Sequence, residues 1–199
     1  MPPTPLELQL RDGTPVLVRA LVPEDREGLA EAYRRLSPQA RYNRFWTHTG
    51  EVIGEKMLDR LLDLNPATHQ AWAVLDPARP FPGAGVASWW RSPQNPDEAE
   101  FSATVLDGDH GRGIGTLLLA MLWLTAFKQG VRQFVAYSLT ENHQASTWML
   151  DCGAQSHWDG YQNVYHWNLE NLDLLPDTPA AADLANWLDF LASEILGSG

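Results

Sequence analysis

The chain lacks paired cysteines, an apolar run that could cross a membrane, and any lysine or arginine after Arg132. One cysteine, Cys152, excludes a disulfide within the chain. A membrane-spanning helix needs about 18 or more apolar residues, and the densest apolar segment, 114–127, is shorter. Residues 1–5 lack the charged and apolar regions of a secretory signal. These absences predict a cytoplasmic protein with no membrane partner.

The charge is strongly acidic and unevenly distributed. The net charge is −11, and the part of the chain after Arg132 carries aspartate and glutamate but no lysine or arginine. Nucleic-acid binding relies on clustered lysine and arginine, so we expect no nucleic-acid partner. Such a surface would attract a cationic substrate, for example an amine or a basic peptide, or it would serve solubility alone. Composition leaves both interpretations open.

The patterning predicts one α/β domain and a short extension. A length of 199 residues fits one compact domain. Alternating or β-branched segments predict strands at 15–21, 71–75, 85–90, 98–106, 132–138 and 162–169. Helical patterns lie at 23–36, 38–45, 57–62, 114–125 and 142–151, and a further helix at 184–196 follows a proline-rich linker at 176–179. We expect a domain over residues 1–171 and an acidic helical extension over residues 172–199.

The most informative segment, residues 105–115, reads Val-Leu-Asp-Gly-Asp-His-Gly-Arg-Gly-Ile-Gly. Its last three glycines alternate between the end of a strand and the start of an apolar helix. Amide groups at the N-terminus of a helix bind anions, and Arg112 adds a positive charge. The segment therefore predicts a site for a phosphate or a pyrophosphate.

Two common phosphate motifs do not fit. A P-loop has Gly-Lys-Ser/Thr after its glycines, whereas Ile114 and Gly115 follow Gly113 here. A dinucleotide fingerprint needs a third glycine where this chain has Thr116 or Leu118.

Residues 110–115, His-Gly-Arg-Gly-Ile-Gly, resemble the acetyl-CoA pyrophosphate motif of the GNAT superfamily of N-acetyltransferases, Gln/Arg-x-x-Gly-x-Gly/Ala, with His110 at the first position. The order of predicted elements over about residues 13–170 is also similar to the GNAT fold. This resemblance implies a mixed, mostly antiparallel sheet flanked by helices, with a splayed central pair of strands and an extra C-terminal helix. It also implies acetyl-CoA as co-substrate, bound between the strands that end near Val105 and Ser138.

The resemblance further implies which groups contact the cofactor. Amide groups of residues 111–115 would hold the pyrophosphate, and backbone groups of residues 101–105 would pair with pantetheine. Asn142 begins an Asn-x-x-Ala segment with the family's spacing. For His110, donation to a phosphate oxygen and simple filling of the turn are equally good interpretations. The expected cofactor contacts are Phe101, Ala103, Val105, His110, Gly111, Arg112, Gly113, Ile114, Gly115 and Asn142.

Transfer of an acyl group to an amine benefits from a general base, because an alkylamine is largely protonated at neutral pH. Glu100 is the single acid between residues 99 and 105, and in a strand it shares a face with Ser102 and Thr104. Spacing alone equally allows an exposed glutamate at a strand end.

Residues 99–115 and the segment 36–45, Leu-Ser-Pro-Gln-Ala-Arg-Tyr-Asn-Arg-Phe, resemble the GNAT domain of bacterial protein lysine acetyltransferases. In that domain the glutamate matching Glu100 is the general base. The resemblance implies a protein lysine as acceptor, with a small-molecule amine as the alternative.

The chain departs from the family at two positions. Met149 stands where many relatives carry the tyrosine that protonates the leaving thiolate, and Ala154 replaces an aromatic residue. The general acid is therefore unassigned, and a non-catalytic acyl-CoA sensor is a second hypothesis. Retention of Glu100 argues for catalysis.

Other candidate residues point to packing. We expect Cys152 to be a small buried side chain, and Arg41 and Arg44 to join acidic neighbours rather than a substrate carboxylate. The pair Trp89 and Trp90 either lines the substrate groove or packs in the core. No metal site is expected, because the histidines lack ligand spacing: they are His48, His69, His110, His143, His157 and His166. The oligomeric state is open.

Overall fold

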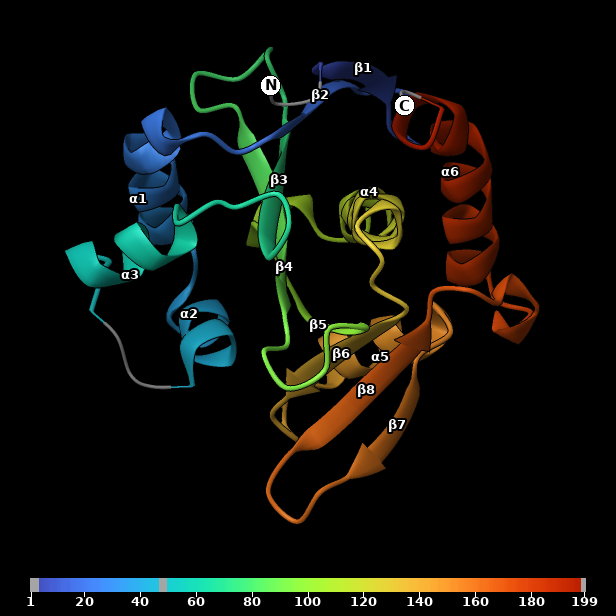
Figure 1. Cartoon of the computed structure of the whole chain (residues 1–199). Coiled ribbons are helices and arrows are strands. Elements are labelled where there is room, and N and C mark those ends of the chain that lie inside the picture. Colours follow the sequence, from blue (N-terminus) through green and yellow to red (C-terminus); the bar gives the residue numbers. More distant parts are fainter. Residues whose placement is uncertain (1–3, 47–49, 198–199) are drawn as a thin grey trace.

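A computed structural model of the chain describes residues 4–46 and 50–197, and its eight strands form one sheet in the order β1-β2-β3-β4-β5-β6-β8-β7 (Figure 1). The strands are β1 (Leu6–Gln9), β2 (Pro15–Ala20), β3 (His69–Leu75), β4 (Gly83–Arg91), β5 (Glu98–Val105), β6 (Gln133–Ser138), β7 (Gln155–Trp158) and β8 (Asn163–Asn168). The helices are α1 (Arg26–Arg35), α2 (Pro38–Phe45), α3 (Glu55–Leu61), α4 (Ile114–Lys128), α5 (His143–Asp151) and α6 (Pro179–Ile195). The mixed, mostly antiparallel sheet and the extra C-terminal helix confirm the expected fold class.

Two strands were absent from the sequence-based expectation. The chain's first strand is β1, which pairs with β2 at the edge of the sheet, so the strand predicted at 15–21 is the second. Strand β7 pairs with β8 at the opposite edge, and all four of its residues are exposed. Both are four-residue edge strands, and β7 carries no alternation of buried and exposed side chains that a pattern search could detect.

Helix α6 begins five residues earlier than predicted, inside the expected linker. The hydroxyl of Thr178 accepts a hydrogen bond from the amide of Ala181 at 3.1 Å, and Pro179 occupies the first helical position. A threonine cap followed by proline is a strong helix start. The linker prediction at 176–179 was therefore wrong at its C-terminal end.

The helices cover the two faces of the sheet. Helices α1, α2 and α3 lie together on one face, and α4 and α6 lie on the other (Figure 1). Instead of presenting one apolar stripe, α4 is buried on all sides, from Thr116 to Ala126. The sheet covers one side of it and α6 the other, and Leu184, Leu188 and Leu191 of α6 join the main core. Among the described residues, no helix is long and apolar enough to cross a membrane.

The central strand pair separates early, as expected for a splayed pair. Strands β5 and β6 run parallel and pair over only three positions, ending at Glu100 opposite Val135. On its other edge β5 stays paired with β4 as far as Val105. Because β5 and β6 then diverge, the edge of β5 beyond Glu100 borders an opening in the sheet.

Candidate active site

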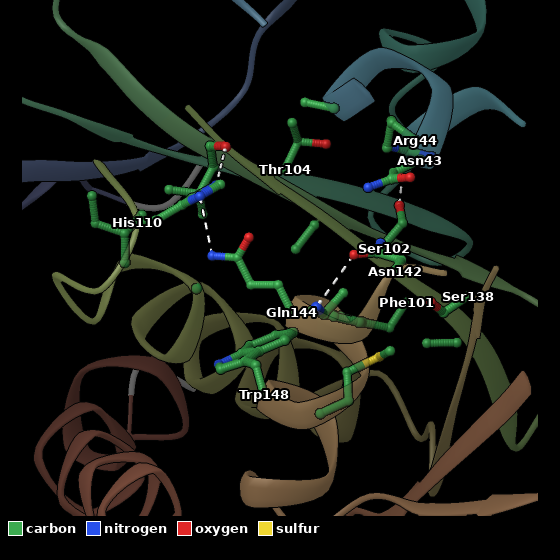
Figure 2. Close-up of a pocket in the computed structure, with 18 of the residues that line it drawn as sticks. Asn43, Arg44, Phe101, Ser102, Thr104, His110, Ser138, Asn142, Gln144 and Trp148 are labelled. Atoms are coloured by element: carbon green, nitrogen blue, oxygen red, sulfur yellow. Dashed lines mark hydrogen bonds between the residues drawn. The ribbon is translucent and has the colours of Figure 1, made fainter. Parts of the chain in front are cut away.

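The opening between β5 and β6 is a cleft of about 830 Å³. Strand β5, the glycine turn before α4, the end of β6, the start of α5, and α2 all contribute to its walls (Figure 2). Nearly all of the site residues expected from the sequence line this one cleft. These residues are Glu100, Phe101, Ala103, Val105, His110, Gly111, Gly113, Ile114, Gly115 and Asn142.

The glycine turn has a backbone shape that other residues would not adopt easily. Gly111 and Gly113 have φ angles of 77° and 85°, in the left-handed region. A Cβ at Gly115 would lie 3.3 Å from Cζ2 of Trp148, so glycine permits the close approach of α5. The first hydrogen bond within α4 joins the amide of Leu117 to the carbonyl of Gly113 at 3.0 Å. The amide groups before Leu117 therefore have no acceptor within the helix, and the turn suits an anion.

The side chain of Arg112 does not line the cleft. Its guanidinium donates to the carboxylate of Asp12 at 2.8 Å, to the hydroxyl of Thr14 at 2.8 Å, and to Asp109. Asp109 is 2% exposed and also accepts two hydrogen bonds from Arg79, at 2.7 and 2.8 Å. The positive charge expected at the anion site is thus neutralised, and Arg112 contributes a fixed backbone to the turn.

His110 ties the turn to its surroundings. Its Nε2 lies 3.0 Å from the carbonyl oxygen of Val105, which can only accept, so Nε2 carries the proton. Its Nδ1 then accepts from the side-chain amide of Gln144 on α5 at 3.2 Å, across the cleft (Figure 2). Both ring nitrogens are engaged within the protein, which favours the turn-filling interpretation.

The start of α5 forms the wall opposite β5. Asn142 caps this helix, because its side-chain oxygen accepts from the amide of Ala145 at 3.4 Å. Gln144 and Trp148 also line the cleft, and Trp148 donates to the hydroxyl of Thr116 at 3.2 Å. The sequence analysis did not identify Gln144 or Trp148 as site residues. Gln144 and Trp148 are four residues apart on the helix predicted at 142–151, so they share one face of that helix. This spacing is the sequence signal that could have identified them.

Glu100 lies at the fork where β5 and β6 part, and it is exposed to the cleft. As alternation predicted, Ser102 and Thr104 share its face, whereas Phe101 points into the core and contacts Phe134 and Trp167. The carboxylate is therefore accessible from the open side of the cleft.

Tyr137 on β6 also lines the cleft near this fork, and sequence reasoning missed it. Burial raises the pKa of the Tyr137 hydroxyl, and the negative charges of Glu100, Glu98 and Asp159 raise it further. These three carboxylates place negative charge around Tyr137. A cationic group would be attracted there.

The expectation that Arg41 and Arg44 join acidic neighbours was wrong. Arg41 is 6% exposed and donates to the carbonyl of Leu36 at 2.9 Å. Arg44 lines the cleft and donates to the hydroxyl of Ser102 at 3.0 Å (Figure 2). Their hydrogen-bond partners are thus a carbonyl and a hydroxyl rather than carboxylates. Burial lowers the pKa of Arg44, and the charge of Glu100 opposes that shift from a distance.

The remaining candidates are structural. Cys152 is fully buried, and burial raises the pKa of its thiol to about 12, so it is a packed side chain as expected. Trp89 is also fully buried, and Trp90 stacks on His69 at 3.4 Å between ring centroids. Trp89 therefore packs in the core, as one of the two interpretations held, whereas Trp90 is half-buried and pairs with Glu100 across β4 and β5 without lining the cleft. Within residues 4–46 and 50–197, no group of three or more His, Cys, Asp or Glu side chains could hold a metal ion; His48 lies outside these residues.

Comparison with known proteins agrees with this geometry. A profile of the family described as "Acetyltransferase (GNAT) domain" matches residues 16–155. Acetyltransferase Pat of Mycolicibacterium smegmatis is 31% identical over 139 residues, which are 70% of this chain and 41% of that protein. The chain therefore spans less than half the length of this relative.

Two solved structures share the fold. The GNAT domain of S. lividans PAT superposes with a TM-score of 0.75 at 22% identity, covering 82% of this chain and 96% of that domain. The yncA structure from Salmonella typhimurium, solved with its cofactor acetyl-CoA, has a TM-score of 0.60 at 16% identity, covering 77% of this chain and 94% of that one.

Proposed function

The chain belongs to the GNAT acetyltransferase family, and we propose that it transfers the acetyl group of acetyl-CoA to a primary amine, with Glu100 as general base. The observation that carries this proposal is the position of Glu100 at the fork of β5 and β6, in the same cleft as the glycine turn. An anion site and a carboxylate in one cleft are what a CoA thioester and an amine acceptor require.

The residues of the cleft fit the cofactor in three places. The amide groups of residues 111–115 suit the pyrophosphate, since the helix amides before Leu117 have no intrahelical acceptor. The edge of β5 over residues 101–105 is free of β6 and suits the amides of pantetheine. Asn142 and His110 line the same cleft and complete its walls. Arg112 would contribute through its backbone, because its guanidinium is held by Asp12 and Asp109.

In the proposed reaction acetyl-CoA supplies the thioester. Glu100 takes a proton from the ammonium group of the acceptor, and the neutral amine nitrogen then attacks the thioester carbonyl carbon. The new C–N bond forms as the C–S bond breaks, the nitrogen gives up its second proton to water, and CoA leaves as a thiolate that takes a proton from water. A thiolate is a good leaving group, so the reaction does not require a tyrosine at the position of Met149.

The acceptor we favour is a protein lysine. The carboxylate of Glu100 lines the cleft, and together with Glu98 and Asp159 it places negative charge around Tyr137 near the fork, which favours a cationic amine. The resemblance of residues 36–45 to protein lysine acetyltransferases supports the same class. A small-molecule amine is the alternative within the same chemistry. Residues 172–199 would form an extension of the domain over residues 1–171, and we propose a cytoplasmic protein.

The test is release of free CoA from acetyl-CoA in the presence of basic peptides, polyamines or aminoglycosides. We expect release to depend on the acceptor, and Glu100→Gln to lower turnover by about 100-fold or more while acetyl-CoA affinity is retained. The panel also separates a protein lysine from a small amine.

Glu98→Gln is the matched control, because Glu98 lies on the same strand and face as Glu100 but does not line the cleft. It should retain most of the activity. Equal turnover of wild type and Glu100→Gln would exclude Glu100 as the base. Tight binding of acetyl-CoA with no release for any acceptor would instead favour a sensor.

A further inference from the structure

Arg11 is a cation at the glycine-turn end of the cleft that the sequence pattern did not identify. It lies in the turn between β1 and β2, its side chain is 58% exposed, and it lines the cleft. Its guanidinium pairs with Asp183 of α6, with Nη2 2.8 Å from Oδ2. The pair joins residues 172 positions apart and places α6 at the edge of the cleft.

Asp183 lies very close to the glycine turn. A Cβ built on Gly113 would be 3.4 Å from Oδ2 of Asp183. A carboxylate therefore lies beside the N-terminus of α4, where the amide groups favour negative charge. The Asp183 carboxylate contacts both the Arg11 guanidinium and the space beside Gly113, so it places Arg11 near the glycine turn.

Arg112 offers no free guanidinium to the phosphates of CoA at the glycine turn. The guanidinium of Arg112 is held by Asp12, Asp109 and Thr14 and does not line the cleft. Among the described residues that line the cleft, Arg11 and Arg44 are the only arginines, and no lysine is present. Arg44 is at the other end, bound to Ser102 on β5 (Figure 2). This leaves Arg11 for an anion at the glycine turn.

We propose that Arg11 binds a phosphate group of CoA and that Asp183 competes with this phosphate for Arg11. The inference rests on the proposed function. The 3′-phosphate of CoA carries more charge than a carboxylate, and every phosphate of CoA can form strong charge-assisted hydrogen bonds with arginine. When CoA binds, Arg11 exchanges Asp183 for the phosphate, and α6 thereby sets the affinity of the cofactor site.

The first experiment measures CoA binding by titration calorimetry with the whole chain. We expect Arg11→Gln to weaken CoA binding by about 10-fold, the lower range for a hydrogen bond to a charged group. Arg34→Gln is the matched control, since Arg34 is 57% exposed, pairs with Glu31 and does not line the cleft. It should leave the affinity unchanged.

Titration with 3′-dephospho-CoA identifies the phosphate. A loss in Arg11→Gln for CoA but not for 3′-dephospho-CoA assigns Arg11 to the 3′-phosphate. An equal loss for both ligands assigns it to the pyrophosphate. Unchanged affinity for both ligands would overturn the inference. Failure of the wild type to bind CoA would instead overturn the proposed function on which the inference depends.

The competing role of Asp183 predicts a change of opposite sign. We expect Asp183→Asn to tighten CoA binding by about 3-fold, as removal of a surface ion pair would allow, and the double variant with Arg11→Gln to show no such gain. Asp189→Asn, on an exposed position of α6, is the control for net charge. Weaker or unchanged binding in Asp183→Asn would overturn the competition.

Discussion

Replacement of Asp109 by asparagine tests whether an ionic network shapes the glycine turn. The Asp109 carboxylate is 2% exposed and joins Arg79, from the loop after β3, to Arg112 in the turn. Arg79 also pairs with Asp76 at 2.9 Å, and Arg112 with Asp12 at 2.8 Å. Three loops are thus connected through one buried carboxylate. An asparagine side chain would keep the shape of the aspartate but lose the charge that both guanidinium groups face.

The expected cost follows from these contacts. Removal of one partner from a buried ion pair typically costs about 3–5 kcal/mol. Here Arg79 is 37% exposed, and each arginine keeps a second carboxylate. We therefore expect Asp109→Asn to lower the free energy of unfolding by about 2–3 kcal/mol. Because the glycine turn would loosen, CoA affinity should also fall.

The assay is urea unfolding at neutral and acidic pH. Burial alone would raise the pKa of Asp109, but hydrogen bonds from Arg79 and Arg112 outweigh burial and lower it. A carboxyl with a lowered pKa contributes stability above the pKa of the unfolded chain, and this contribution is lost as pH falls through the folded pKa. Asp109→Asn should therefore lose stability at neutral pH and show a smaller further loss on acidification. With Asp189→Asn as control, a loss below about 0.5 kcal/mol at neutral pH would refute the reasoning.

Two further predictions concern packing and titration. A Cβ at Gly85 would lie 2.8 Å from Cγ2 of Ile114, so Gly85→Ala should cost about 1–3 kcal/mol in chemical unfolding and weaken CoA binding. Gly28→Ala, which meets nothing within 4 Å, should cause no loss; equal losses in both variants would contradict the packing argument. His69 is 1% exposed, burial lowers its pKa, and its Nδ1 donates to the carbonyl of Asp63 at 2.9 Å. The stability that neutral His69 contributes should be present above the unfolded pKa of about 6.5 and decline as pH falls below that value. His69→Gln should therefore flatten the fall in Tm between about pH 7 and pH 5. The control His143→Gln, at the start of α5, should show the same fall in Tm as the wild type.

The sequence predicted those features that depend on local chemistry. Ser37 and Pro38 predicted the start of α2, and the Ser37 hydroxyl indeed accepts from the amide of Ala40 at 3.1 Å. Alternation along β5 correctly separated Glu100 and Ser102 from Phe101. Capping, alternation and glycine turns involve neighbours within a few positions, so they can be recognised in one sequence.

Features that depend on distant partners could not be predicted in this way. The orientation of Arg112 is set by Asp12, which lies 100 positions earlier, and by Thr14. The pair of Arg11 and Asp183 depends on α6 lying along α4, a packing that no local pattern specifies. The apolar residues all around α4 were a usable signal, because a helix that is apolar on every side must be covered on every side.

The three-position pairing of β5 with β6 has a mechanical consequence. The sheet consists of two halves, β1 to β5 and β6 to β8, which share a seam only from Glu98 to Glu100. Past this seam, the pantetheine of the proposed acetyl-CoA complex would lie along β5 in the place of a missing strand. The bound substrate would then join the two halves of the sheet as β6 joins β5 at the seam.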